Sequence, residues 1–204
     1  MKRLLVLAPH PDDETLGVGR IIAAHARRRR PLMVVALTDG QASHPGSKRW
    51  PPKRLGQRRR GELRRALARL GAGRAALRFM GWQDLRLAEQ ARPLRLRRLV
   101  AEFRPDLILT ADEADHHPDH KAAHALAARL GRRFATVPVW AKLGTPGLPR
   151  SRGPHRAAKA WATAAYRSQM PGVIDDAQEA FTFAPDVLAL LRDTAESVRA
   201  GRAR

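Results

Sequence analysis

Two short motifs that combine histidine with carboxylates stand far apart in the chain. The first is His-Pro-Asp-Asp-Glu at residues 10–14, and the second is His-His-Pro-Asp-His at residues 116–120. Each follows a short apolar run, residues 4–8 and 107–110, of the kind that forms a buried strand. Because loops at the carboxyl ends of parallel strands converge on one crevice, we expect these imidazoles and carboxylates to meet there. Such groups ligate catalytic metals, so the pattern indicates a metal-dependent hydrolytic site.

The first motif also has a purely structural interpretation. Aspartate at a helix start commonly caps the helix, and Glu14 suits the positive end of the helix dipole. Capping does not account for His10 or for the two prolines that frame it. Asp12 and Asp13 are neighbours whose side chains must point in different directions. One carboxylate can therefore ligate a metal while the other stays free to act as a base.

The second motif belongs to a cluster of four histidines within nine residues, His116, His117, His120 and His124. Pro118 is expected at the first helical position, where its missing N–H costs nothing. His117 then lies at the helix start and His120 in the first turn, while His120 and His124 share a face. We expect a functional role for His117 and His120, with His116 and His124 supporting them or facing solvent.

Apolar runs alternate with helix signals along the chain. Strands are expected at residues 4–8, 32–37, 77–80, 107–110 and 136–140, and helices at 13–30, 53–70, 93–103, 119–130, 156–170 and 185–199. The alternation predicts an α/β fold, a Rossmann-like doubly wound, mainly parallel sheet with helices on both faces. The 204 residues are most simply one domain, 1–204, in which the glycine- and proline-rich stretch 144–155 forms a loop or lid.

The composition narrows the class of protein. The chain has no cysteine, which excludes disulfides, thiolate nucleophiles and cysteine-based zinc fingers. No stretch approaches the ~20 apolar residues needed to span a membrane, and the apolar start is too short for a signal peptide. A cytoplasmic protein without a transmembrane segment is therefore expected.

The net charge of +20 raises the alternative of a nucleic-acid-binding protein. The basic residues, however, are spread over nearly every expected helix, and aromatic residues make up only 5% of the chain, too few for base-stacking platforms. Seven of the 19 acidic residues instead fall at 12–14 and 112–119, beside the histidines. This clustering indicates a cation site, and no specific nucleic-acid partner is expected.

A nucleotide-binding module is a further alternative for a Rossmann-like topology. Gly17 and Gly19 lie too far into the first expected helix to cradle a phosphate. Acidic side chains at the turn would also repel a pyrophosphate. The sequence therefore lacks the fingerprint of a dinucleotide site.

Taken together, the motifs resemble those of the PIG-L/LmbE-like family of metal-dependent N-deacetylases. The two signatures are residues 10–14 and 117–120. Further similarity lies at residues 38–46 (Thr-Asp-Gly-Gln-Ala-Ser-His-Pro-Gly), 59–63 (Arg-Arg-Gly-Glu-Leu), 81–84 (Gly-Trp-Gln-Asp) and 166–169 (Tyr-Arg-Ser-Gln). The likeness extends over roughly residues 3–170.

The resemblance implies a zinc ion, with ferrous iron as a possible substitute, held by His10, Asp13 and His120. Two imidazoles and one carboxylate leave an open position for water, as catalytic zinc requires. Metal binding would lower the pKa of that water toward neutrality.

The resemblance also implies roles for five other residues. Asp12 is the general base, and His117, if protonated, stabilises the oxyanion. Asp119 orients a histidine, and Arg59 and Asp84 contact the polar substrate. The implied substrate is an N-acetylated amino sugar or glycoconjugate, with a non-sugar amide conjugate as the alternative. The natural substrate and the oligomeric state are left open.

Overall fold

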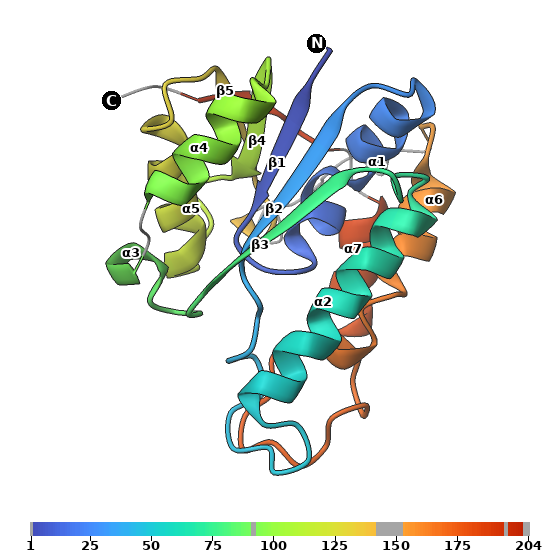
Figure 1. Ribbon diagram of the computed structural model, residues 1–204. Helices are drawn as coiled ribbons and strands as arrows, with labels where there is room; N and C mark the ends of the chain where they lie inside the picture. The colour runs from blue at the N-terminus through green and yellow to red at the C-terminus, as the bar shows by residue number, and fades with distance from the viewer. Residues whose placement is uncertain (1, 91–92, 142–152, 194–195, 202–204) are drawn as a thin grey trace.

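A computed structural model describes residues 2–90, 93–141, 153–193 and 196–201 of the chain. Six strands form one sheet in the order β3-β2-β1-β4-β5-β6 (Figure 1). The strands are β1 Leu4–Ala8, β2 Leu32–Thr38, β3 Ala76–Trp82, β4 Leu107–Ala111, β5 Phe134–Val137 and β6 Arg199–Ala200. The first five run parallel, and β6 pairs antiparallel with β5. The predicted mainly parallel α/β sheet is confirmed.

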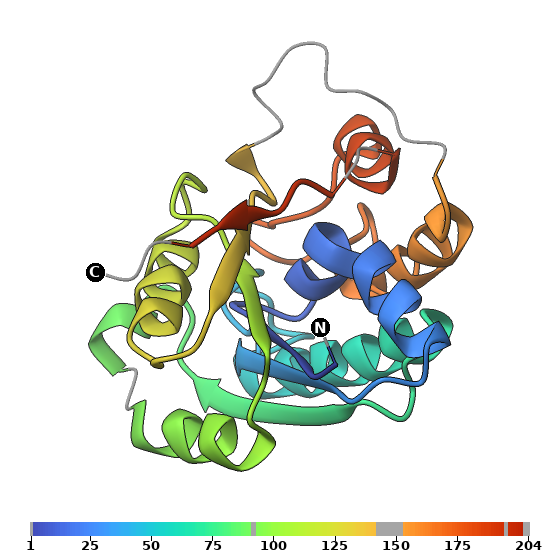
Figure 2. The ribbon, with the colours of Figure 1, turned by 90° about the horizontal axis from the view of Figure 1, so that it is seen from above.

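Helices cover both faces of the sheet (Figures 1 and 2). One face carries α1 Asp13–Arg27, α2 Pro52–Arg69, α6 Arg156–Thr163 and α7 Pro185–Asp193. The other carries α4 Pro93–Phe103 and α5 Pro118–Ala128, with the short α3 Leu87–Gln90 beside α5. Within the described ranges, no helix has both the length and the apolar character needed to cross a membrane.

The central strand shows why the sheet needs two helical layers. Leu4 and Val6 of β1 pack into one apolar cluster, and Leu5 and Leu7 pack into the other. All four side chains are almost completely buried. Successive side chains of a strand point to opposite faces, so an unbroken apolar run must be covered on both.

The two motifs meet because of the strand order. Strands β1 and β4 are neighbours, with Leu7 opposite Thr110, although about a hundred residues separate them. The order reverses between them, since β2 and β3 lie on one side of β1 and β5 lies beyond β4. Ligands of open α/β sheets bind at such a switch point, outside the carboxyl ends of the strands. The first motif follows β1 and the second follows β4.

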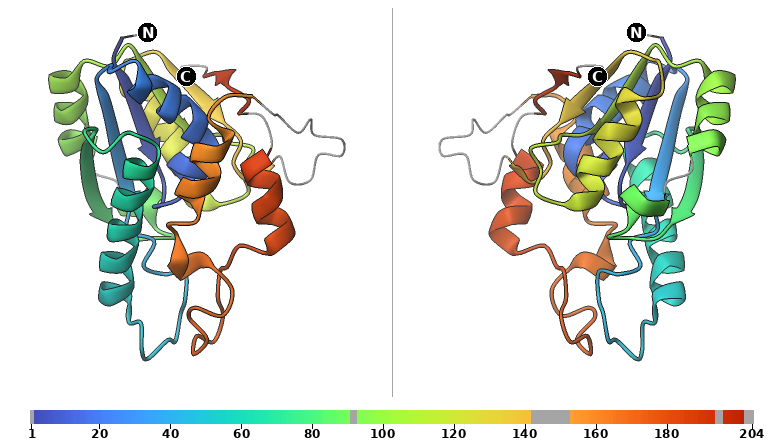
Figure 3. Two further views of the ribbon diagram at one scale, coloured as in Figure 1. Left: turned by 90° about the vertical axis from the view of Figure 1, so that its right-hand side faces the viewer. Right: turned by 90° about the vertical axis from the view of Figure 1, so that its left-hand side faces the viewer.

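Two loops extend past this edge of the sheet and lie side by side (Figures 1 and 3). They comprise residues 39–51 and 170–184. The Phe181 amide donates to the Ser43 carbonyl at 2.9 Å, and the Gln178 amide donates to the Pro45 carbonyl at 3.0 Å. The two loops are thus hydrogen-bonded to each other beside the switch point.

Several predicted elements differ from the structure. The helix expected at 13–30 ends at Arg27. The strand expected at 136–140 lies at Phe134–Val137, because Pro138 cannot donate to the ladder. The helix expected at 156–170 ends at Thr163, with a separate 3₁₀ turn at Arg167–Gln169. The helix expected at 185–199 ends at Asp193, and its last expected residue begins β6. Most of the predicted lid, residues 144–152, lies outside the described residues.

Candidate metal and hydrolytic site

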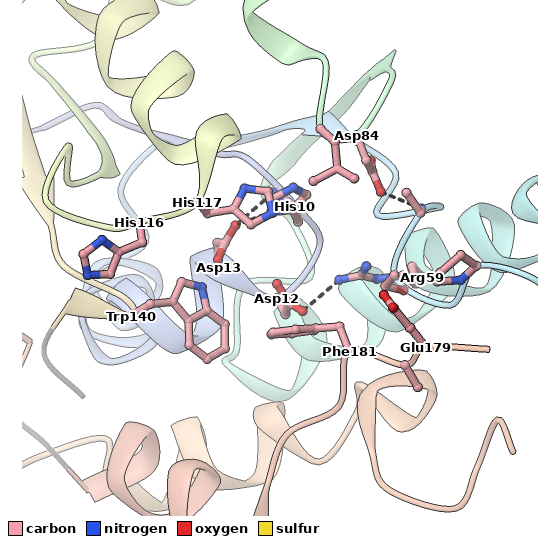
Figure 4. A pocket seen from close by; sticks show the side chains of 15 residues that line it. His10, Asp12, Asp13, Arg59, Asp84, His116, His117, Trp140, Glu179 and Phe181 are labelled. Carbon is pink, nitrogen blue, oxygen red and sulfur yellow. Dashed lines mark hydrogen bonds and ion pairs between the residues drawn. The ribbon is translucent and has the colours of Figure 1, made fainter. Parts of the chain in front are cut away.

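A cavity of about 760 Å³ lies at the switch point. Its wall includes His10, Asp12, Asp13, Arg59, Asp84 and His117, all of which the sequence singles out. Figure 4 shows the side chains of His10, His117, Asp12 and Asp13 facing the same space. His120 lies just behind them, fully buried, with its ring centroid 5.6 Å from that of His10. The structure therefore brings the two distant motifs together.

Asp13 lies between the imidazoles of the two motifs. Its Oδ2 atom is 3.2 Å from Nδ1 of His10 and 3.2 Å from Nε2 of His120. In a tetrahedral zinc site with bonds of 2.0–2.1 Å, neighbouring ligand atoms lie about 3.3 Å apart. The two distances from Asp13 Oδ2 are therefore those expected between neighbouring ligands of one divalent cation, for which His10, Asp13 and His120 are the candidate ligands.

The remaining ring nitrogens of these histidines bind carboxylates. His120 Nδ1 lies 2.8 Å from Asp115 Oδ2, and His10 Nε2 lies 3.0 Å from Asp119 Oδ2. If His10 carries its proton on the nitrogen that faces Asp119, and His120 on the nitrogen that faces Asp115, each ring keeps a lone pair on the nitrogen that faces Asp13. This is the arrangement in which protein carboxylates orient metal-binding histidines.

Asp115 is a candidate site residue that sequence reasoning missed. It is fully buried. In addition to its contact with His120, it accepts hydrogen bonds from the backbone N–H groups of Val139, Trp140 and Ala141. It thus ties His120 to the chain just after β5. The only sequence signal was its place among the acids before the second motif, which does not indicate its partners.

Buried carboxylates make this centre favourable for positive charge. Burial opposes protonation of His10 and His120, but the carboxylates around them outweigh it. Asp119 and Asp13 raise the pKa of His10 to about 10, and Asp13 and Asp115 raise the pKa of His120 to about 9. The two imidazoles in turn hold the pKa of Asp13 well below its usual range, despite burial. A divalent cation can supply the same positive charge as the protons.

His117 precedes α5 and caps it. Its Nδ1 atom accepts the Asp119 N–H at 3.1 Å, and burial and the neighbouring His10 lower the pKa of His117 to about 4. A neutral ring that accepts at Nδ1 carries its proton on Nε2. One ring nitrogen each of His10, His117 and His120 lies within 4.8 Å of the others, a spacing that would also suit a set of metal ligands. The proton on Nε2, however, makes His117 a hydrogen-bond donor and not a ligand. The predicted role assumed a protonated His117, whereas the structure favours the neutral ring.

Asp12 occupies the N-cap position of α1, but side-chain capping does not account for its carboxylate. Its side chain makes no capping hydrogen bond and lies 2.8 Å from Nη2 of Arg59. Its backbone has φ 136°, a conformation that side-chain-bearing residues rarely adopt. Burial raises the pKa of Asp12 to about 7, although Arg59 opposes the shift. A strained, buried carboxyl group of this kind is typical of a functional site.

Asp84 shapes the loop that follows β2. Its two carboxylate oxygens accept the backbone N–H groups of Gly40, at 3.1 Å, and Ala42, at 2.8 Å. Arg59 binds the same loop, because its Nη1 donates to the Gly40 carbonyl at 2.7 Å. Both predicted substrate-contacting residues line the cavity and also hold its wall in place.

The mouth of the cavity has an apolar rim that the sequence did not indicate. Leu85, Trp140 and Phe181 all line the cavity, and Leu85 and Phe181 are exposed. Trp140 and Phe181 pack edge to face, on the opposite side of the centre from Asp84 (Figure 4). His116 lines the cavity too, whereas the ring of His124 packs against Phe134, away from it.

The segment 166–169, which carried part of the resemblance, connects three parts of the site. The hydroxyl of Tyr166 donates to Glu14, Ser168 donates to Glu62 at 2.6 Å, and the Gln169 amide donates to Ser43. Its residues therefore bind α1, α2 and the loop after β2, and sequence similarity there reflects buried contacts.

Comparisons with known proteins agree with this geometry. The family model described as "PIG-L: GlcNAc-PI de-N-acetylase" matches residues 5–130. A 1D-myo-inositol 2-acetamido-2-deoxy-alpha-D-glucopyranoside deacetylase of Thermomonospora curvata is 32% identical, over 82% of this chain and 61% of its own. A probable N-acetyl-alpha-D-glucosaminyl L-malate deacetylase of Bacillus anthracis is 35% identical, over 67% of this chain and 61% of its own. The chain thus spans about three fifths of either relative's length.

A solved structure gives the same result for the fold. A conserved protein of Thermus thermophilus superposes with a TM-score of 0.72 at 25% identity, covering 100% of this chain and 96% of its own. The family match covers more than half of the chain and includes both motifs. The protein is therefore a member of the PIG-L family, whose members include the LmbE-like deacetylases.

Proposed function

We propose that this protein is a metal-dependent hydrolase that removes an acetyl or other acyl group from an N-acylated amino sugar or glycoconjugate. The observation that carries the proposal is the convergence of Asp13 Oδ2 with one ring nitrogen each of His10 and His120, beside Asp12. Relatives named for deacetylating glucosamine linked to inositol or malate support this substrate class.

His10, Asp13 and His120 are the residues proposed to hold the ion, zinc in the first place and ferrous iron as the alternative. Two imidazoles and one carboxylate form a donor set that catalytic zinc uses, with room left for a reacting molecule. When bound, the ion supplies Lewis-acid catalysis and makes water acidic enough to react near neutral pH.

The residues around the centre have separate tasks in this proposal. Asp12 takes a proton from the attacking water and delivers it to the amine nitrogen as the amide C–N bond breaks; its raised pKa suits both steps. His117 donates its Nε2–H to the carbonyl oxygen as negative charge develops there. Asp119 keeps the ring of His10 oriented, and Arg59 does the same for Asp12. The products are a carboxylate and a free amine.

The polar end of the substrate is proposed to lie against the wall that Arg59 and Asp84 support. The apolar rim of Leu85, Trp140 and Phe181, of which Leu85 and Phe181 are exposed, favours a second candidate, an amide conjugate whose amine part is apolar and not a sugar. The cytoplasmic location expected from the sequence is retained as part of this proposal.

The test combines elemental analysis of the purified protein with a screen for free-amine release. N-acetylglucosamine derivatives and non-sugar acetamides are compared, with and without a chelator. We expect one equivalent of metal, amine release from the sugars and loss of activity with chelator. Asp12→Asn should retain the metal but lose at least about 100-fold in kcat. His120→Ala should lose the metal, and His124→Ala, outside the cavity, should match the wild type.

Three results would count against the proposal. They are absence of metal, activity that survives removal of the metal, and an Asp12→Asn variant that retains full activity. A protein that ignores amides but binds nucleic acid with a steep salt dependence would instead support the nucleic-acid alternative.

A further inference from the structure

The first helix is interrupted directly behind the site. Helix α1 consists of two helical segments joined at Val18, whose φ of −133° and ψ of 23° are not helical. The first segment begins at Asp13, immediately after Asp12. The interruption therefore separates the turn that carries the acids of the site from the rest of the helix. Gly17 and Gly19, which are not part of a phosphate loop, flank this point.

A buried ion pair from two later parts of the chain spans the interruption. In an unbroken helix, the Leu16 carbonyl would accept the Arg20 N–H. Here Lys159 Nζ donates to the Leu16 carbonyl at 2.7 Å. Glu196 accepts the Arg20 N–H at 2.8 Å and the Ile21 N–H at 3.0 Å. Lys159 Nζ also lies 2.9 Å from Glu196 Oε1, so the pair bridges the two helical segments.

This bridge is unusually buried for an ion pair. The side chain of Lys159 is 0% exposed and that of Glu196 is 3% exposed. Removing two charges from water costs several kcal/mol per ion, which only good partners offset. An exposed pair, Arg156 with Asp193, already joins α6 to α7. Attachment of the C-terminal segment therefore does not by itself require a buried pair at α1.

We propose that Lys159 and Glu196 are positioning residues that set the orientation of the first turn of α1, and hence of Asp13, relative to His120. The metal ligands come from separate elements, and Asp13 Oδ2 lies 3.2 Å from His120 Nε2. A metal site tolerates displacements of only about 0.5 Å. Lys159 and Glu196 lie beyond the family match, which ends at residue 130. In this proposal, residues outside the matched segment also shape the site.

The direct test measures zinc affinity by competition with a chromophoric chelator, without substrate. Lys159→Met and Glu196→Ala should each lower zinc affinity about tenfold or more, the range known for residues that orient metal ligands. The Arg156→Ala/Asp193→Ala double variant, which removes the exposed pair between α6 and α7, should stay within twofold of the wild type. If deacetylation is established, which rests on the proposed function, kcat should fall with little change in KM.

Reversing the pair separates bridging from simple charge attraction. The Lys159→Glu/Glu196→Lys double variant keeps opposite charges but places a carboxylate against the Leu16 carbonyl. It also places an ammonium group against the Arg20 N–H. Zinc affinity should therefore stay low in this variant. Restoration of affinity by the reversed pair would overturn the proposal.

A milder variant covers the case in which charge removal prevents folding. A Cβ at Gly19 would lie 3.2 Å from Lys159 Cγ, so Gly19→Ala pushes the Lys159 side chain by a few tenths of an ångström without removing a charge. Gly61→Ala in α2 is the matched control, because its Cβ meets nothing closer than 3.6 Å. Zinc affinity should fall for Gly19→Ala only. Folded Lys159→Met or Gly19→Ala protein with wild-type zinc affinity would contradict the proposal, whether or not the enzyme deacetylates anything.

Discussion

Arg59 holds Asp12 in place through a buried ion pair, with Nη2 2.8 Å from Oδ2 and both side chains at most 4% exposed. The guanidinium also donates to the carbonyls of Pro11, at 2.9 Å, and Gly40, at 2.7 Å. These contacts join the first motif, the loop after β2 and helix α2. A residue with the backbone conformation of Asp12 carries about 1–3 kcal/mol of strain, and it keeps that conformation only where the surrounding contacts hold it in place.

Arg59→Lys should therefore damage catalysis more than its conserved charge suggests. An ammonium group lacks the planar fork that reaches three acceptors at once. We expect kcat to fall about 100-fold or more, with zinc affinity little changed, in a free-amine release assay. Arg60→Lys is the control, because Arg60 pairs with Asp39 through two hydrogen bonds and neither residue lines the cavity. An Arg59→Lys enzyme as active as the control would contradict this role.

Gly40→Ala tests how closely that loop approaches Arg59. Gly40 has φ 64°, and a Cβ there would lie 2.0 Å from Arg59 Nη1. Gly71 has φ 74°, and a Cβ added there would meet nothing within 4 Å, so Gly71→Ala isolates the backbone cost of about 1–2 kcal/mol. Urea unfolding should show a clearly larger loss for Gly40→Ala, accompanied by loss of activity. Equal losses would show that the loop can move away from Arg59.

The sheet and the meeting of the two motifs were predictable because their signals are local. Buried parallel strands appear as short apolar runs, and parallel topology places the loops after these strands at one edge of the sheet. His10 and His120 could therefore be placed together without knowing any contact. Asp115 could not, because one acid among several becomes specific only through its partners, here His120 and three backbone amides.

The C-terminal part was less predictable because tertiary contacts override its local preference. The alanines around residue 164 favour a longer helix, but the chain turns there, and Tyr166 reaches Glu14. The sequence of residues 196–199 also continues a helical pattern. The structure does not place these residues in a helix, because Glu196 binds α1 and Arg199 pairs with β5. Neither partner is near in sequence, so no local pattern could reveal these endings.

Asp115→Asn should weaken the metal site without touching the cavity wall. An amide cannot replace both carboxylate oxygens. Two donors, His120 Nδ1 and the Val139 amide, now bind Asp115 Oδ2, and an NH₂ group in that place would face them without accepting a hydrogen bond. We expect zinc affinity to fall about 10- to 100-fold in chelator competition. Asp112→Asn serves as the control, since Asp112 is also buried but binds Thr136 and a backbone amide. Similar losses in both variants would point to a general effect of removing buried charge.

His44 should make the protein less stable as the pH falls. Burial lowers the pKa of His44, with a further contribution from Arg59, and its Nε2 has no hydrogen-bond partner among the described residues. The unfolded chain has the ordinary histidine pKa of about 6.5 and so binds a proton at a pH where folded His44 stays neutral. The free energy of unfolding must then decrease as the pH falls below about 6.5 toward the lower folded pKa. His44→Gln lacks this proton linkage, while every other titrating group is common to both proteins. In urea unfolding at pH 7, 6 and 5, the stability of wild type relative to His44→Gln should therefore shrink stepwise, and a constant difference would show that His44 titrates normally in the folded protein.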